Sequence, residues 1–405
     1  MGTSPEGTPT LRRPNDQPRL VTPLFLLIML ATFAYFVSVG ALVPTLPRFV
    51  KQVLEGSDAA VGLVIGSFAF SAIVLRPAVG RLGDRRGRRL LIVAGAGFVA
   101  VSVAAYTLAG SLTTLLLLRL VSGVGEAGFY VGAASVINDL APDARRGEAL
   151  SYFSLALYGG LAVGPVVGES VLELASFPMV WLVAGAFAVA AGILGLPVRD
   201  TRLEPAERPA GGRIVHPAGL MPGVVMACSV CGLAGFNTFV PLYALDIGLG
   251  GSRAVFVTYS AIVMLIRSFG ARIPDVMGPR RAAPTALGVS GLGLWLMAAW
   301  PGSAGLYAGT ALFAVGQALA FPALMTIAVE AAPASERAAV VGTFTAFFDL
   351  AFGGGAIGLG AVAEVLGYRG SFGVAGAVAA GGALLLLGRA QRRRQKAAAQ
   401  LRRAA

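Results

Sequence analysis

Residues 80–89, which read Gly-Arg-Leu-Gly-Asp-Arg-Arg-Gly-Arg-Arg, decide how the rest of the chain is interpreted. They lie between two long apolar runs and contain five arginines and a single acid, Asp84. So many charges are too costly to place in hydrocarbon, so the stretch has to lie at a water interface. Its glycines permit a tight turn. The sequence therefore predicts a short charged connection between two membrane-spanning helices, with Asp84 available to pair with an arginine or to face a helix N-terminus.

The composition is typical of a membrane protein. Of the 405 residues, 56% are hydrophobic and 13% are charged, whereas ordinary soluble domains carry about 25% charged residues. The net charge of +12 does not indicate nucleic acid as a partner, because the basic residues fall in short connectors and near the chain ends rather than along one amphipathic face. Cys228 and Cys231 lie in an apolar run and are interpreted as buried apolar residues. No role is assigned to His216.

Twelve apolar runs are long enough to cross a bilayer, which takes about 20 residues each. They lie at 22–46, 58–80, 90–109, 112–137, 149–171, 177–197, 218–245, 253–274, 281–300, 304–329, 338–361 and 368–388. The first run is too long for a signal peptide, and five more follow it, so it is a span. The sequence thus predicts an all-α membrane protein with the following parts: an N-terminal tail (1–21), a six-helix half (22–197), a charged linker (198–217), a second six-helix half (218–388) and a basic tail (389–405).

The distribution of basic residues predicts the orientation. If both termini are cytoplasmic, 25 of the 32 lysines and arginines lie on the cytoplasmic side. Positively charged connectors are typical of that side. We expect a multi-pass protein of the plasma (inner) membrane, with residues 389–405 at the anionic inner leaflet.

An internal repeat relates the two halves. An offset of 191 residues pairs basic, acidic and glycine positions across four predicted helices, among them Arg76 with Arg267, Arg81 with Arg272, Asp84 with Asp275, Glu126 with Gln317 and Gly164 with Gly355. Two parallel halves related by an axis along the membrane normal explain such an offset. The second copy of the charged stretch is degraded, with Val276 in place of Arg85 and Pro279 in place of Arg88. We therefore expect the first copy to carry the gating contacts.

The charged stretch closely resembles the signature Gly-x-Leu-x-Asp-Arg-x-Gly-Arg-Arg/Lys of the major facilitator superfamily. Every defining position matches: Gly80, Leu82, Asp84, Arg85, Gly87, Arg88 and Arg89. The resemblance implies a transporter rather than an enzyme, with two halves that expose a central site alternately to each side. It also implies that Asp84 and its arginines latch the cytoplasmic side, with the eleventh span as partner.

Charged residues inside the spans are functional candidates, because each costs at least about 2.5–3.5 kcal/mol to insert. Glu126 and Asp349 lie near the middle of spans 4 and 11, where desolvation disfavours the ionised carboxylate and suits reversible proton binding. Arg119 lies two turns before Glu126 on the same face, in a run that resembles the superfamily's proton-coupling motif. We expect proton coupling by Glu126, Arg119 and Asp349, with a structural role as the alternative for each acid. Arg76 and Arg267 lie nearer the helix ends and are interpreted as structural.

The fifth span carries a motif of small residues, Gly160-x-x-x-Gly164-Pro165-x-x-Gly168-Glu169. Glycines four residues apart let two helices approach closely, and proline bends a helix. The run resembles the Gly-x-x-x-Gly-Pro-x-x-Gly-Gly motif of the drug–proton antiporter branch, with Glu169 in place of the last glycine. This resemblance favours export. It leaves open whether Glu169 takes part in proton entry or faces water.

No phosphate-binding loop and no cluster of metal ligands occurs in the sequence, so we expect no cofactor and a proton gradient as the energy source. The predicted function is proton-coupled export of a small, apolar drug or natural product by a monomer. Candidate residues of a central substrate cavity were chosen by depth and polarity: Tyr35, Asn237, Tyr243, Gln317, Phe347 and Phe348. One alternative is an uptake carrier for a sugar, an organic acid or another metabolite. The other is a receptor that transports nothing, which long soluble extensions would favour.

Overall fold

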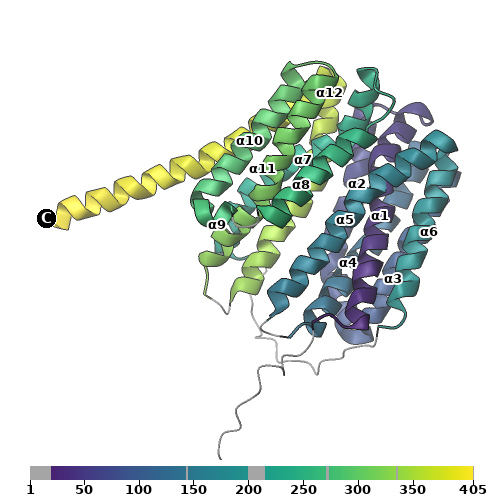
Figure 1. Ribbon diagram of the computed structural model, residues 1–405, viewed down its shortest axis with the longest axis horizontal. Coiled ribbons are helices and arrows are strands. Elements are labelled where there is room, and N and C mark those ends of the chain that lie inside the picture. Colours follow the sequence, from purple (N-terminus) through teal and green to yellow (C-terminus); the bar gives the residue numbers. More distant parts are fainter. Residues whose placement is uncertain (1–19, 143–144, 199–214, 271–272, 334–335, 405) are drawn as a thin grey trace, which may run out of the picture.

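The computed structural model describes residues 20–142, 145–198, 215–270, 273–333 and 336–404. Within these ranges every regular element is a helix, and the helices form two bundles that lie side by side (Figure 1). The predicted N-terminal tail and the linker between the halves fall almost entirely outside the described residues.

Six long helices form the first half of the chain. They are α1 (Pro23–Gln52), α2 (Asp58–Arg86), α3 (Arg88–Ala104), α4 (Leu112–Leu140), α5 (Arg146–Leu174) and α6 (Phe177–Gly195), with a short 3-10 helix, η1 (Ala105–Leu108), after α3. Buried aromatic residues pack α1, η1 and α6 together, where the ring of Trp181 meets Phe49 and Tyr106 edge to face with ring centres 5.4 and 5.6 Å apart.

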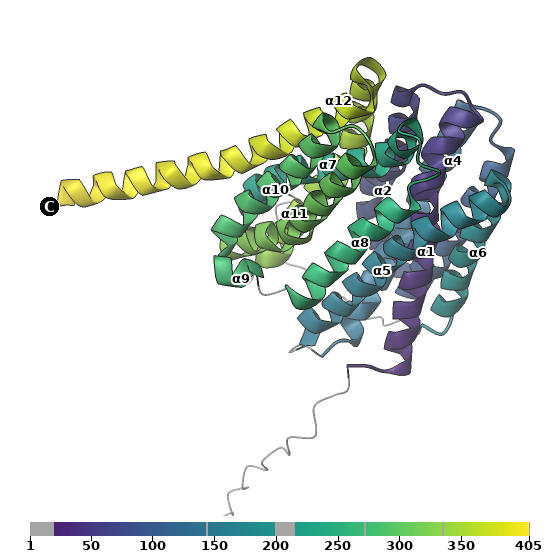
Figure 2. The ribbon, with the colours of Figure 1, turned by 45° about the horizontal axis from the view of Figure 1, so that its top comes forward.

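The second half has the same order of helices. They are α7 (Pro217–Asp246), α8 (Arg253–Phe269), the short α9 (Ile273–Met277), α10 (Pro279–Ala299), α11 (Ser303–Glu330) and α12 (Arg337–Ala404). The segment α12 contains two of the predicted spans, which are separate helices that meet at a kink at Gly367, where φ is 70°. Its final part extends away from the bundle (Figures 1 and 2).

The prediction of a twelve-helix membrane protein is confirmed. Ten segments of the described chain are long and apolar enough to cross a bilayer. One of these segments, Ala339–Gln391, holds two predicted spans, and α8, with 17 residues, is the remaining one. Each of the twelve predicted spans therefore contains a long helix.

The charged stretch forms a tighter connection than expected. Helix α2 continues through it to Arg86, and only Gly87, at φ 97°, separates α2 from α3. A residue with a side chain rarely adopts such a φ value. The equivalent residue of the second half, Gly278, has φ 78° and separates α9 from α10. The stretch is thus mostly helical, and both copies break at the same glycine.

The two halves meet along three helix pairs, α1 with α7, α2 with α12 and α5 with α8. Glycines bring α2 and α12 into backbone contact: a Cβ atom on Gly62 would lie 2.3 Å from the carbonyl oxygen of Ala356. A Cβ atom on Gly66 would lie 2.6 Å from the carbonyl oxygen of Gly353. We call the end of the bundle that holds Gly87 the signature end, and the end where α5 ends and α8 begins the opposite end.

Candidate functional site

An ion pair joins the two halves near the middle of the bundle. The guanidinium of Arg76 on α2 pairs with the carboxylate of Asp349 on α12. Both side chains are half-buried, with 26% and 19% of their surface exposed. The guanidinium also lies 5.1 Å from the centre of the Tyr130 ring on α4. Arg76, interpreted from the sequence as structural, therefore connects α2, α4 and α12.

The carboxyl group of Glu126 lies one turn from Tyr130 on α4, within electrostatic range of Arg76. Glu126 is 8% exposed, and Arg76 is the cation whose charge acts on it. The hydroxyl of Tyr35 lies beside it, and the Tyr35 ring stacks on Phe129 at 3.9 Å. Among the described residues neither Oε2 of Glu126 nor the Tyr35 hydroxyl has a hydrogen-bond partner. Glu126 is thus a buried acid with one carboxylate oxygen, Oε2, that no hydrogen bond from the described residues stabilises.

Arg119 does not pair with Glu126. Its Nε atom donates to the carbonyl oxygen of Val64 on α2 at 3.1 Å, and its guanidinium lies 4.4 Å from the centre of the Phe68 ring. Side chains on a helix point toward its N-terminus, so Arg119 extends away from Glu126, which lies two turns closer to the C-terminus. Both residues are on α4 as predicted, but Arg76 takes the position next to Glu126 that was expected for Arg119.

A second arginine crosses between the halves on the other side of the bundle. The guanidinium of Arg267 on α8 lies 3.9 Å from the centre of the Tyr158 ring on α5. Tyr259, about two turns before Arg267 on α8, interacts electrostatically with both residues. The Nε atom of Arg267 is buried and has no hydrogen-bond partner among the described residues.

Glu169 closes the opposite end of the bundle. Its carboxylate is completely buried and accepts hydrogen bonds from the backbone N–H of Ser252 at 2.9 Å, the Ser252 hydroxyl at 2.6 Å and the backbone N–H of Arg253. The first N–H groups of a helix lack partners within it and favour a negative charge. Glu169 at the end of α5 therefore caps α8 across the two halves, and the interpretation that it faces water is wrong.

A second carboxylate makes the corresponding contact on the other side of the opposite end. The Glu364 carboxylate of α12 accepts hydrogen bonds from the backbone N–H groups of Asp58 and Ala59, at 2.7 and 3.2 Å. The Tyr368 hydroxyl donates to the Asp58 carboxylate at 3.1 Å. A helix of each half thus caps the first turn of a helix in the other half.

Two of the predicted cavity residues lie at or beside the equivalent positions 126 and 317. Tyr35 lies beside Glu126. Gln317 holds the position equivalent to Glu126 in the second half, where its Nε2 atom donates to the carbonyl oxygen of Ser229 at 3.0 Å. Gln317 therefore joins α11 to α7 as a neutral, hydrogen-bonded residue, while Glu126 is the ionisable member of the pair.

The structure does not bring the other predicted cavity residues to Glu126. Tyr243 is buried within the second half, where its ring meets Phe372 at 5.6 Å. Phe347 packs against α7 at Gly223. The ring centres of Phe348 and Phe321 lie 6.3 Å apart, and Asn237 is half-buried on α7. Three tyrosines that the sequence does not single out belong to this region: Tyr130 and Tyr158 lie against the two cross-half arginines, and Tyr259 interacts electrostatically with Arg267.

A family model described as Major Facilitator Superfamily matches residues 28–283 and 223–404. The chain belongs to the major facilitator superfamily. It is 28% identical over 364 residues to an uncharacterised MFS-type transporter of Salmonella typhimurium, covering 87% of this chain and 92% of that protein. It is 30% identical over 241 residues to multidrug resistance protein 1 of Bacillus subtilis, covering 57% of this chain and 61% of that protein.

A solved structure has the same fold. The crystal structure of a bacterial homolog to the human lysosomal transporter Spinster, in an occupied conformation, gives a TM-score of 0.75 at 16% sequence identity. The match covers 90% of this chain and 96% of that chain. The likeness supports the fold alone. The family establishes a multi-pass membrane transporter of small molecules and not an enzyme.

The superfamily signature ties helices together within the first half. Arg88 forms an ion pair with Asp139 on α4 and donates to the carbonyl oxygen of Ser135 at 3.0 Å. Arg85 and Arg89 are exposed. The side chain of Asp84 lies outside the part of the chain that the structure describes, so its latch to the eleventh span stays a prediction.

The glycines of the antiporter-like motif pack α5 against α1. A Cβ atom on Gly164 would lie 2.5 Å from the Cα atom of Gly40, and one on Gly168 would lie 2.2 Å from the carbonyl oxygen of Ala41. Gly160 makes a similar contact with α1, and Pro165 is buried in the middle of α5. The motif therefore builds the first half, and Glu169 at its end reaches the second.

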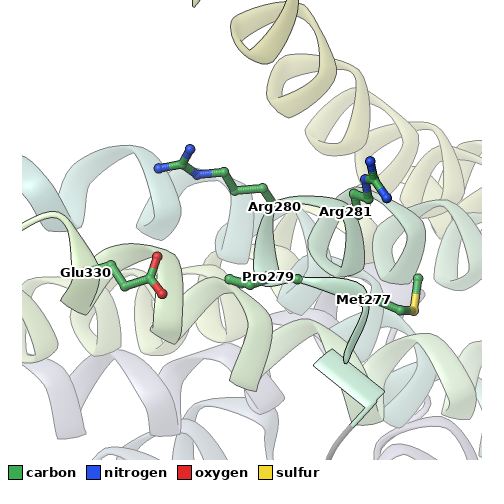
Figure 3. Close-up of a pocket in the computed structure, with 6 residues that line it drawn as sticks. Met277, Pro279, Arg280, Arg281 and Glu330 are labelled. Atoms are coloured by element: carbon green, nitrogen blue, oxygen red, sulfur yellow. The ribbon is translucent and has the colours of Figure 1, made fainter. Parts of the chain in front are cut away.

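A surface pocket lies apart from these residues, at the degraded copy of the signature (Figure 3). It is lined by Met277, Gly278, Pro279, Arg280, Arg281 and Glu330. The two guanidinium groups and the Glu330 carboxylate occupy separate edges of it (Figure 3). None of the predicted site residues lines this pocket, so the candidate site is the layer of charged and aromatic residues between the halves.

Proposed function

We propose that this transporter exports small, largely apolar organic compounds in exchange for protons. In this proposal it acts as a monomer in the plasma membrane, with the signature end and both termini cytoplasmic. The observation that carries the proposal is the position of Glu126: it is buried, one carboxylate oxygen has no hydrogen-bond partner among the described residues, and it lies beside an arginine that pairs with the other half of the chain.

Arg76 gives protonation of Glu126 a mechanical consequence. When Glu126 is ionised, it competes with Asp349 for the guanidinium of Arg76. When Glu126 binds a proton this competition ends, and Arg76 is held by Asp349 alone. Charges in a poorly solvated site act strongly on each other. Proton binding therefore changes the strength of the link between the two halves, as alternating access requires.

Contacts between the halves close the opposite end in this state of the transport cycle. Glu169 and Glu364 both accept hydrogen bonds from helix N-termini of the other half. At the buried carboxylate of Glu169, each hydrogen bond to the charged group contributes about 1.5–3 kcal/mol. These contacts have to break when the transporter opens at that end, and the predicted Asp84 latch then closes the signature end.

Three observations support export of apolar compounds. The relative from Bacillus subtilis is named a multidrug resistance protein, at 30% identity. The motif that resembles the drug–proton antiporter branch is intact at Gly160, Gly164, Pro165 and Gly168. The surroundings of Glu126 include the aromatic rings of Tyr35, Phe129 and Tyr130. An apolar compound suits these surroundings better than a sugar.

Accumulation of a lipophilic dye in a drug-sensitive host tests the direction of transport. We expect cells that produce the protein to hold less dye than cells without it, and a protonophore to abolish the difference. Unchanged accumulation across a broad panel of dyes would contradict multidrug export. Higher accumulation would favour the uptake carrier instead.

A further inference from the structure

The offset of 191 residues between the halves relates two contacts as well as two sets of residues. Arg76 and Arg267 are equivalent positions, and the same offset takes Tyr158 to Asp349. Arg76 of α2 pairs with Asp349 of α12, and Arg267 of α8 lies over the ring of Tyr158 of α5. The same cross-half contact therefore occurs twice, once with a carboxylate and once with an aromatic ring.

The two arginines differ in how their charge is balanced. Arg76 has the carboxylate of Asp349 in contact and that of Glu126 nearby. No carboxylate among the described side chains forms an ion pair with Arg267, and its Nε atom has no hydrogen-bond partner there. A tyrosine ring attracts a cation through its quadrupole but carries no net charge. Among the described side chains, the positive charge of Arg267 thus has no neutralising anion.

The surroundings of Arg267 leave it able to meet a ligand. The side chain is half-buried, so part of its surface is accessible. The ring of Tyr158 lies against it, and Tyr259, which packs on Phe236 and Phe313, is close enough to interact with it electrostatically. A guanidinium presents several N–H donors in one plane, which match the two oxygens of a carboxylate. Two aromatic rings beside that plane suit an apolar group attached to the same compound.

We propose that Arg267 binds the carboxylate of a transported organic anion, and that Tyr158 and Tyr259 contact the apolar part next to it. The carboxylate of the compound then takes the role at Arg267 that Asp349 has at Arg76. This inference rests on the proposed function only in that the compound is transported. It narrows the substrate class from apolar compounds in general to amphiphilic carboxylates.

Binding to the purified full-length protein in detergent tests this inference without any proton gradient. The probes are a series of aryl-alkanoates of increasing chain length, from benzoate to 4-phenylbutyrate, with the primary amide and the amine of each skeleton. Calorimetry or ligand-induced thermal stabilisation measures the affinity. We expect at least one carboxylate to bind about tenfold or more tightly than its amide and amine, which corresponds to about 1.4 kcal/mol.

Three variants locate the anion at Arg267. Arg267→Gln should lower carboxylate affinity about tenfold and leave amide affinity unchanged, and Arg267→Lys should restore part of the loss because it keeps the charge. Tyr158→Asp places a carboxylate at the position equivalent to Asp349. It should also weaken carboxylate binding, and it should strengthen amine binding. Monodisperse elution and an unchanged helical circular dichroism spectrum show that each variant is folded.

Several results would overturn the inference. These are equal affinity for carboxylate and amide, equal loss of all probes in Arg267→Gln, or failure of every carboxylate in the series to bind. The proposed function fails separately. If cells export a neutral dye in a proton-dependent way and no carboxylate binds, export stands and the role of Arg267 is refuted.

Discussion

The guanidinium of Arg76 on α2 and the carboxylate of Asp349 on α12 form an ion pair that joins the two halves of the transporter. Glu126 lies close enough to this pair for the charge of Arg76 to act on it. A proton that binds at Glu126 therefore changes the electrostatics of a contact between the halves. This relationship is the physical basis for coupling proton movement to the alternation of the two halves.

Asp349→Asn tests the cross-half pair. We expect a loss of about 1–3 kcal/mol in the free energy of unfolding, between the values for exposed and buried ion pairs, since both side chains are half-buried. Substrate-driven proton movement should also decrease, because Arg76 is then held by Glu126 alone. Thermal unfolding in detergent and proton flux in proteoliposomes measure the two effects. Asp349→Glu keeps the charge and is the control; equal loss in both variants would argue for steric disruption instead.

Glu169→Gln tests the contact that closes the opposite end. A neutral amide caps the first turn of α8 less well than a carboxylate, so we expect a larger fraction of molecules to be open at that end. The distance between spin labels at Leu174 on α5 and Val257 on α8, measured by double electron–electron resonance, should then be longer.

Glu173→Gln is the matched control for this experiment. Glu173 lies one turn further along α5 and pairs with Arg253 at 3.2 Å, but its side chain is 43% exposed. Exposed ion pairs contribute about 0–1 kcal/mol, so its distance distribution should remain that of the wild type. Identical distributions for Glu169→Gln and the wild type would show that the buried cap does not hold this end closed.

Gly164→Ala tests the packing role of the antiporter-like motif. The added Cβ atom would lie 2.5 Å from the backbone of Gly40, so α1 and α5 have to move apart. Overpacking of this kind costs about 1–3 kcal/mol. Gly97→Ala adds the same group to α3, where no atom lies within 4 Å, and should leave thermal unfolding unchanged. If both variants unfold at the wild-type temperature, the close approach of α1 and α5 is not needed for stability.

Asp84→Asn tests the predicted latch at the signature end. We expect slower transport with normal membrane insertion and folding, measured as substrate flux and as detergent-extracted yield. Asp275→Asn is the matched control at the equivalent position. It should have a smaller effect, because the second copy of the signature has lost the residues that match Arg85 and Arg88. Normal flux in Asp84→Asn would refute the latch.

The sequence was sufficient to predict the helices and the internal repeat, because both depend on local properties. The length of an apolar run predicts a membrane span. The break between α2 and α3 occurs at a glycine, Gly87, and the arginines around it indicate that this break lies at the membrane–water interface. The 191-residue offset predicts two equivalent halves.

Side-chain partners across helices were harder to predict. Arg119 and Glu126 share a helix face, but the tilt of side chains toward the N-terminus directs Arg119 to α2 and leaves Glu126 to Arg76. Glu169 was assigned to no partner because the N-terminus of α8 that it caps is 83 residues away. The repeat also indicates the second cross-half contact. The residue 191 positions before Asp349 is Tyr158, which is the partner of Arg267.

Substrate-driven proton movement in proteoliposomes tests the central claim most directly. With an imposed pH gradient, addition of a transported compound to the wild-type protein should release protons across the membrane, and Glu126→Gln should abolish this release. Glu148→Gln, which changes an exposed acid on α5, should behave as the wild type. The account predicts uncoupling in Glu126→Gln alone; normal coupling in that variant would contradict the role of Glu126 as the proton carrier.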